Sequence, residues 1–488
     1  MERGTTTLSH RRLERRALLR GAAQAVGLAG LPSLLAACGG TAGATSGAAT
    51  ATGAVTSTAA TSAGTSSAPR SQQQSSAAPA PASAGQAAPS RAAGHVVFLD
   101  PDAGALGDIK TKAVAEFNAN GSGLTVERVF GEGAKTYEKL QAMLAGGTSP
   151  DLFWSWGYWK NATAAKSLLR PFDPYVAREP ADSYVHTWSA GAKDSGTFDG
   201  KLYGFTTQLG VPAVYVNQDL FKSAGVELPP KDYGSQSWTV DGYLDTARKL
   251  TRAAPDGTPL QFGSNMWGLW WAGFNWIIET YGGAVFDPQW KDCWLDHPEA
   301  IDAVTWLADL RLKEHVAPTT AQDKGGTFGF DGGKDAMSVT WAHSAADHVK
   351  TIGNRFQWNV YPLPRGKALQ VSGCAFNWYC LPQDGKQPDA AWQFVRSMAS
   401  PTIVQRFLAQ GVSFPFMSSG QGAMWQDFPQ LNRQMAIEAM PLVRTAPLLP
   451  RDPEIEDAIK QQLNPVFEGQ GAVREAMLSA KHAVLPLL

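Results

Sequence analysis

The chain has 488 residues and balances 42 Lys and Arg against 43 Asp and Glu, which gives a formal net charge of −1. A balance this close to zero argues against a polyanion such as nucleic acid as the main partner. The last 395 residues are mildly acidic, and all 17 Trp lie at or beyond Trp154. Because a segment of this length exceeds the roughly 250 to 300 residues that one hydrophobic core supports, two lobes are expected.

The N-terminus has the pattern of an export signal. A basic start precedes an apolar stretch from Ala22 to Ala37. This stretch is shorter than the ~20 residues of a spanning helix and contains glycine and proline, so residues 1–37 are predicted to be a cleaved signal rather than a permanent membrane anchor. Arg15-Arg16 and the residues after it resemble a twin-arginine signal, with Arg11-Arg12 as an alternative pair.

A lipid anchor and a tether are predicted next. Leu35-Ala36-Ala37-Cys38 resembles the lipobox of bacterial lipoproteins, which implies cleavage before Cys38 and lipidation of its thiol. The alternative is an ordinary secretory signal in which this cysteine is incidental. Between Gly39 and Ala93 nearly every residue is Ala, Ser, Thr, Gly, Pro or Gln. Residues 38–93 are therefore expected to form the lipidated Cys38 and a disordered tether with a reach of roughly 40 Å.

The segment that follows alternates short apolar strands with helical patterns. Strands are predicted at 95–99, 124–129 and 151–154, and amphipathic helices are predicted around 109–117 and 137–144. This order predicts an α/β lobe with a parallel sheet.

Further along the chain, helices are predicted after Thr239 and Pro298 and over 389–398 and 402–409, and prolines favour extended chain over 356–364. Cys374 and Cys380 either form a disulfide or are buried thiols together with Cys293.

Six sequence blocks, in order, resemble the bacterial extracellular solute-binding proteins of carbohydrate ABC importers. They lie between about Val96 and Pro415 and read GGTSPDLFW, DGKLYGFTTQLGVPAVYVNQDLFKSAGVELPP, SWTVDGYLDTARKLT, DAMSVTW, WNVYPLPRG and PDAAWQFVRSMASPTIVQRFLAQGVSFP. The resemblance implies a periplasmic-binding-protein-like α/β fold with two lobes, crossovers at a hinge and a ligand cleft between the lobes. The expected division is 94–208 and 373–425 for the N-lobe, and 209–372 and 426–488 for the C-lobe.

The resemblance also implies what the protein does. A sugar or oligosaccharide would be captured by lobe closure and delivered to an ABC-type importer, with permease subunits as partners and a monomeric chain at the outer face of the cytoplasmic membrane. No catalysis, cofactor or metal is expected, because HExxH, GxSxG, GxxxxGK[ST] and GxGxxG are all missing from the sequence. A secreted sugar-active hydrolase, a surface lectin, and a binding protein for a glycerol phosphate ester or a polyamine remain alternatives.

Aromatic side chains are the first candidates for ligand contact, because sugars present apolar C–H faces that stack on rings. Trp154 and Trp156 can share one face of a strand, with Trp159 released by the turn at Gly157, while core packing of one of the pair is the alternative. A second cluster holds Trp267, Trp270 and Trp271, for which core packing is nearly as well supported.

Polar and hinge residues complete the set of candidates. By resemblance, Trp341 and His343 follow a buried strand that runs into the cleft, and a solvated surface histidine is the alternative. Gln208 lies in the expected first crossover, either facing the ligand or bridging backbone. Asp102 follows the first strand at its carboxyl end, where open α/β sheets bind ligands, although turn formation is the commoner role.

Overall fold

The computed structural model describes residues 94–488, except 134, 158, 189, 267–270, 324–326, 415–422 and 447. The predicted signal, Cys38 and the tether, together with Trp267 and Trp270, lie outside the described residues. Every helix within the described residues is too short or too polar to cross a bilayer.

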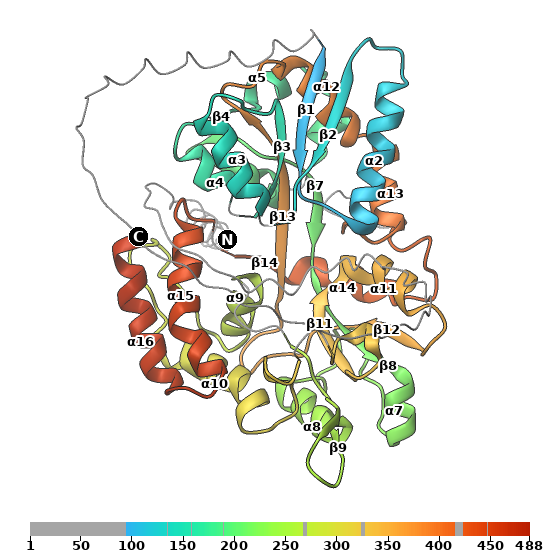
Figure 1. Cartoon of the computed structure of the whole chain (residues 1–488), viewed down its shortest axis with the longest axis vertical. Coiled ribbons are helices and arrows are strands. Elements are labelled where there is room, and N and C mark those ends of the chain that lie inside the picture. Colours follow the sequence, from blue (N-terminus) through green and yellow to red (C-terminus); the bar gives the residue numbers. More distant parts are fainter. Residues whose placement is uncertain are drawn as a thin grey trace, which may run out of the picture.

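The upper lobe in Figure 1 is built on a mixed sheet with the strand order β14-β13-β3-β1-β2, to which β4 and β7 are added through β13. Its strands are β1 (His95–Asp100), β2 (Thr125–Phe130), β3 (Leu152–Trp156), β4 (Leu169–Arg170) and β7 (Phe205–Gly210). A small hairpin joins β5 (Thr197–Phe198) to β6 (Lys201–Leu202). The helices are α2 (Gly104–Asn118), α3 (Lys135–Ala145), α4 (Trp159–Ala164), α5 (Asp173–Val176), α6 (Ala190–Gly196), α12 (Pro388–Met398) and α13 (Pro401–Ala409).

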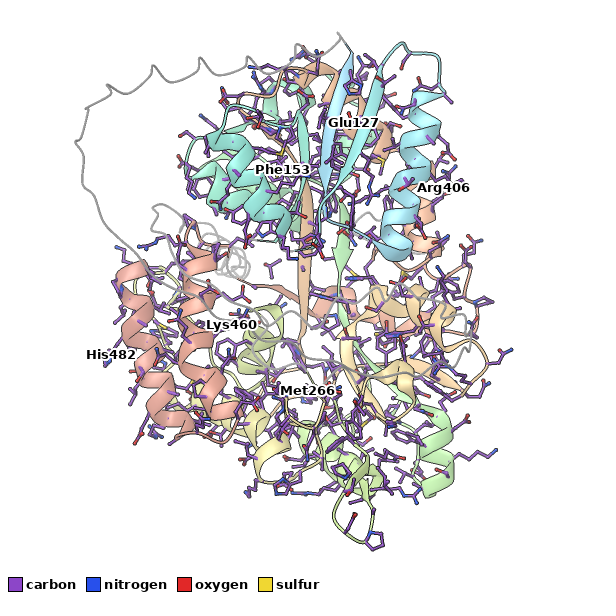
Figure 2. All side chains as sticks on the ribbon, viewed as in Figure 1. Glu127, Phe153, Met266, Arg406, Lys460 and His482 are labelled. Carbon is purple, nitrogen blue, oxygen red and sulfur yellow. The ribbon has the colours of Figure 1, made fainter. Side chains whose placement is uncertain are left out.

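The predicted β-α-β-α-β order of this lobe is confirmed. β1 pairs in parallel with both β2 and β3. Apolar side chains alternate along these strands toward α2 and α12, and Val96, Phe98 and Leu152 are fully buried. Figure 2 shows Phe153 among the side chains that fill the lobe. Since parallel strands end at one edge, the carboxyl ends of β1, β2 and β3 meet where the upper lobe faces the lower one (Figure 1).

The lower lobe holds an antiparallel sheet of order β11-β8-β12 packed among helices. Its strands are β8 (Pro212–Asn217), β9 (Arg252–Ala253), β10 (Pro259–Gln261), β11 (Met337–Trp341) and β12 (Trp358–Tyr361). Its helices are α7 (Gln218–Ala224), α8 (Val240–Leu250), α9 (Trp271–Thr280), α10 (Pro298–Leu312), α11 (Ala345–Ile352), α15 (Asp452–Phe467) and α16 (Val473–Val484). The predicted cap of α8 is present, because the Thr239 side chain accepts from the backbone N–H of Gly242.

Two strands carry the chain between the lobes. β7 ends at Gly210 and β8 begins at Pro212 in the lower sheet, so the first crossover is one residue long. β13 (Ser372–Pro382) runs upward beside it, pairing with β14 (Val443–Thr445) at its lower end and with β3 and β7 higher up. Close to β14, α14 (Arg433–Ala439) lies between the lobes in Figure 1. The boundaries expected after 208 and 372 therefore fall within β7 and at the start of β13.

The cysteines of the described residues are free and buried. Cys374 and Cys380 lie on the same strand, β13, six residues and roughly 20 Å apart, which is too far for a disulfide. Of the two alternatives, the structure supports buried thiols.

We expect Cys293, Cys374 and Cys380 to resist Ellman's reagent in the folded protein and to react fully once guanidinium unfolds a chain trimmed to residues 94–488. Burial raises the pKa of Cys293 to about 12 and raises the pKa of Cys374 and of Cys380 above the usual range of a thiol, so little reactive thiolate exists. Only one reactive thiol after unfolding would contradict the free-thiol assignment.

Candidate functional site

The carboxyl ends of β1, β2 and β3 bring aromatic rings to the edge that faces the lower lobe. Trp156 is the last residue of β3 and is half-buried. Its indole stacks on Trp159, with ring centroids 5.4 Å apart, and Trp159 stacks in turn on Tyr137 at 5.1 Å. Trp156 is thus the partly exposed end of a stack of three rings that is anchored in the lobe.

Phe130 adds a second aromatic side chain at this edge. It ends β2, next to β1, and 52% of it is exposed, which makes it the most exposed large hydrophobic among the described residues. Phe130 was not among the residues predicted from the sequence, although its place at the carboxyl end of a predicted strand is the same signal that indicated Asp102.

Four charged residues lie directly beneath these rings: Asp100, Asp102, Lys110 and Arg128, here called the charge cluster. Lys110 Nζ donates to Asp100 Oδ1 at 2.9 Å and to Asp102 Oδ2 at 2.6 Å. Arg128 Nε donates to Asp100 Oδ2 at 2.7 Å. Burial raises the pKa of Asp100, and the two cations oppose that rise. Two positive and two negative groups make the cluster formally neutral.

Both carboxylate oxygens of Asp102 are bonded to groups within the protein. Its second oxygen, Oδ1, accepts from Trp156 Nε1 at 2.8 Å, and the residue is only 5% exposed. Its carboxylate therefore serves internal contacts, contrary to the expectation that it faces a ligand.

Trp154 and Trp159 differ from expectation for a related reason. Trp154 is fully buried, with Lys110 Nζ 3.7 Å from its ring centroid, so it is the core member of the Trp154–Trp156 pair. Trp159 is 1% exposed, because α4 begins directly after the turn at Gly157 and folds its ring between Tyr137 and Trp156. Neither indole presents a face outside the lobe.

Gln208 bridges backbone and side chain at the crossover. Its Nε2 donates to the carbonyl of Val412 at 2.8 Å, and its Oε1 accepts from Asn377 Nδ2 at 3.1 Å. The carbonyl of the Asn377 side chain accepts from the N–H of Gly157 at 3.3 Å. The bridging alternative describes Gln208, and this bridge connects β7 through β13 to the turn after Trp156.

Trp341, His343 and Trp271 belong to the lower lobe. The ring of His343 stacks on that of Trp341, with centroids 5.7 Å apart, and a methyl group at Gly210 would lie 3.2 Å from its Nδ1. His343 Nδ1 is buried and has no hydrogen-bond partner among the described residues. Both rings therefore lie against the end of β7, at the hinge. Trp271 opens α9, while Trp267 and Trp270 are outside the described residues.

No group of His, Cys, Asp or Glu within the described residues has the arrangement of a metal site. The groups at this edge are stacked rings, side-chain amides and a charge cluster that is formally neutral. Such an arrangement suits a neutral polar ligand with apolar faces.

Comparison with known proteins decides the family. The family model described as bacterial extracellular solute-binding protein matches residues 103–405. This chain belongs to that family. The resemblance stated from the six sequence blocks is thereby confirmed.

Individual members of the solute-binding family are distant in sequence. The maltotriose-binding protein of Pyrococcus abyssi is 24% identical over 370 residues, which cover 73% of this chain and 72% of that protein. Among solved structures, a substrate-binding protein of Listeria monocytogenes in complex with cycloalternan has a TM-score of 0.72 at 21% identity, covering 80% of this chain and 98% of the other. The GacH receptor of Streptomyces glaucescens has a TM-score of 0.69 at 22% identity, covering 82% and 99%. The periplasmic-binding-protein fold with two lobes is confirmed.

His343 supplies a pH prediction. Burial lowers the pKa of His343 to about 4, below the usual 6.5. Because the pKa of His343 is lower in the folded than in the unfolded chain, the unfolded chain binds the proton more tightly. The contribution of neutral His343 to the free energy of unfolding is therefore complete above pH 6.5 and is lost as the pH falls toward 4. We expect the free energy of unfolding to drop by about 1 to 2 kcal/mol more between pH 7 and pH 4.5 in the wild type than in His343→Gln, measured by urea titration. Equal losses in both proteins would show that His343 does not titrate in this way.

Proposed function

We propose that this protein captures a sugar or oligosaccharide by closure of its two lobes and delivers it to an ABC-type importer. The observation that supports this most directly is the pair of aromatic residues, Trp156 and Phe130, at the carboxyl edge of the upper sheet. One relative is named a maltotriose-binding protein, and two of the similar solved structures are described in complex with cycloalternan and with acarbose. These descriptions support a saccharide as the ligand.

The mechanism follows from the two-stranded connection. Ligand contacts made by both lobes would stabilise the closed arrangement relative to the open one, and a permease would recognise the closed shape. The protein itself would do no chemistry and would need no cofactor. In the sequence, the lipobox-like segment before Cys38 and the tether support a lipid anchor that holds a monomeric chain at the outer face of the cytoplasmic membrane.

A thermal-shift screen tests the ligand class. We expect maltose, maltotriose or mannobiose to raise the melting temperature by about 3 °C at a hundredfold excess over Kd, because a ligand that binds only the folded state stabilises it by mass action. Small-angle scattering with the same sugar should show compaction. Glycerol phosphate and spermidine are the comparison ligands, and a shift with one of them alone would replace the sugar. Turnover of the oligosaccharide, followed by chromatography, would refute the binding-protein proposal.

Phe130 supplies a prediction on affinity. We expect Phe130→Ala to weaken binding of the responding sugar about three- to tenfold through lost stacking, while the free energy of unfolding changes by less than about 1 kcal/mol because the ring is exposed. Leu260→Ala is the matched control, since Leu260 is 50% exposed on β10 of the lower lobe. Isothermal titration calorimetry measures both. Equal affinities for Phe130→Ala and Leu260→Ala would remove Phe130 from the site.

A further inference from the structure

The charge cluster is buried next to the rings of the candidate site, and its carboxylates bond to groups within the protein. Asp100 and Lys110 are fully buried, and 14% of the Arg128 side chain is exposed. Burying a charge is expensive unless it is paired and hydrogen-bonded, and breaking such a pair costs more than the pair contributes. A cluster of this kind constrains geometry more than it adds stability.

Every carboxylate oxygen of the cluster has a partner. Asp100 Oδ1 accepts from Lys110 Nζ and from the N–H of Asp102, and Oδ2 accepts from Arg128 Nε. Asp102 Oδ2 accepts from Lys110 Nζ. The remaining oxygen, Asp102 Oδ1, accepts from Trp156 Nε1 at 2.8 Å. The bond from Trp156 is a charge-assisted hydrogen bond, which is stronger than a neutral one. The other ring at this edge, that of Phe130, has its centroid 5.9 Å from the guanidinium carbon of Arg128.

The surroundings of Lys110 hold the Asp102 carboxylate that accepts from Trp156 Nε1. The ring of Trp154 lies 3.7 Å beneath Nζ, so the ammonium cannot withdraw from the two carboxylates. Arg128 also donates to the carbonyl of Asp102 and, at 3.0 Å, to Thr111 Oγ1, which attaches the loop after β1 to α2. A methyl group at Gly107 would lie 2.5 Å from that carbonyl, so glycine is required for α2 to come this close. Lys110 thus holds the carboxylate of Asp102, while Arg128 holds the backbone carbonyl of the same residue.

We propose that Lys110 and Arg128, acting through Asp102, are positioning residues that fix the indole of Trp156 as a ligand platform. The Asp102 bond holds one edge of the ring and the stack on Trp159 holds one face. Without Lys110, the buried carboxylates would outnumber the cations, and the carboxylate of Asp102 would lose the hydrogen bond that holds it and turn away. Trp156 would then lose its anionic acceptor and the ring would move among orientations. A preorganised ring lowers the entropy cost of binding. The relevance to a sugar rests on the proposed function, whereas the fixation of the ring does not.

The test reads the Trp156 indole directly, in the full chain carrying 15N-labelled tryptophan. The Nε1–H resonance of Trp156 is assigned by its loss in Trp156→Phe. We expect Lys110→Met to speed hydrogen exchange of this indole at least about tenfold, the effect of losing one charged hydrogen bond. Lys481→Met is the matched control, because Lys481 also lies between two aspartates, Asp292 and Asp296, but in the lower lobe. Unchanged exchange in a folded Lys110→Met would overturn the proposal, as would equal acceleration in Lys481→Met.

A second measurement separates positioning from general destabilisation. With maltotriose as the probe, Lys110→Met should weaken affinity about tenfold in the wild-type background and add nothing in the Trp156→Phe background, because the two changes remove one shared interaction. Additive losses would mean that Lys110 does not act through Trp156. If Lys110→Met does not fold, Asp102→Asn, which keeps the side-chain shape, is measured in its place with the same expectations. If the wild type does not bind maltotriose, that result counts against the proposed function. The hydrogen-exchange rates of the Trp156 indole then decide the positioning role by themselves.

Discussion

The pairing of β13 with its neighbours is the constraint on which the rest of the structure depends. One strand of 11 residues accepts β14 at its lower end, β3 and β7 along its middle and β4 at its upper end. Because both β7 and β13 cross between the lobes as a hydrogen-bonded pair, the lobes are joined by a short piece of sheet. Asn377 lies in register with Gln208 of β7 and with Trp156 of β3. Movement at the crossover is therefore coupled by direct bonds to the turn after Trp156.

The candidate site combines a rigid upper half with a hinge-side lower half. In the upper lobe, the charge cluster and the stack of Tyr137, Trp159 and Trp156 leave few free rotamers. In the lower lobe, His343 and Trp341 lie against the end of β7, where a glycine leaves room for the imidazole. A ring that is already held in place by buried partners binds a ligand at a lower entropy cost than a ring on an exposed loop. The charge cluster is one such set of buried partners for Trp156.

Much of the fold could be predicted from sequence because its signals are local. The short apolar runs at 95–99 and 151–154, the Thr239 cap and the helix-opening proline at 298 are signals within a few positions of one another in the chain. The structure confirms the elements that they predict. The candidate site was harder, because its outcome depends on pairings between distant residues. Nothing near Asp102 in sequence reveals that Lys110 and Trp156 would occupy both its oxygens. Likewise, the partner of Gln208 is 169 residues away, at Asn377. Trp154 and Trp156 share a strand face, and contacts from elements distant in sequence, Lys110 of α2 and Tyr379 of β13, cover Trp154.

Outside the strands, both apolar and polar contacts join the lobes, and this bears on how easily closure could be biased. One buried apolar cluster contains Leu99 and Phe153 of the upper lobe together with Tyr215 and Val360 of the lower lobe. The N–H of Ala105, in the first turn of α2, donates to Asp347 Oδ1 of α11 at 3.2 Å in an exposed position, and the Asn161 side chain donates to the carbonyl of Leu448, just before α15. Each such bond contributes about 1 kcal/mol, and less where water competes. Two states separated by a few bonds of this size differ by a few kcal/mol, so that a ligand with contacts to both lobes can shift the balance by its differential affinity. A ligand that contacts both lobes would therefore favour one arrangement through the fixed rings of the upper lobe, in addition to the apolar and polar contacts that the lobes already share.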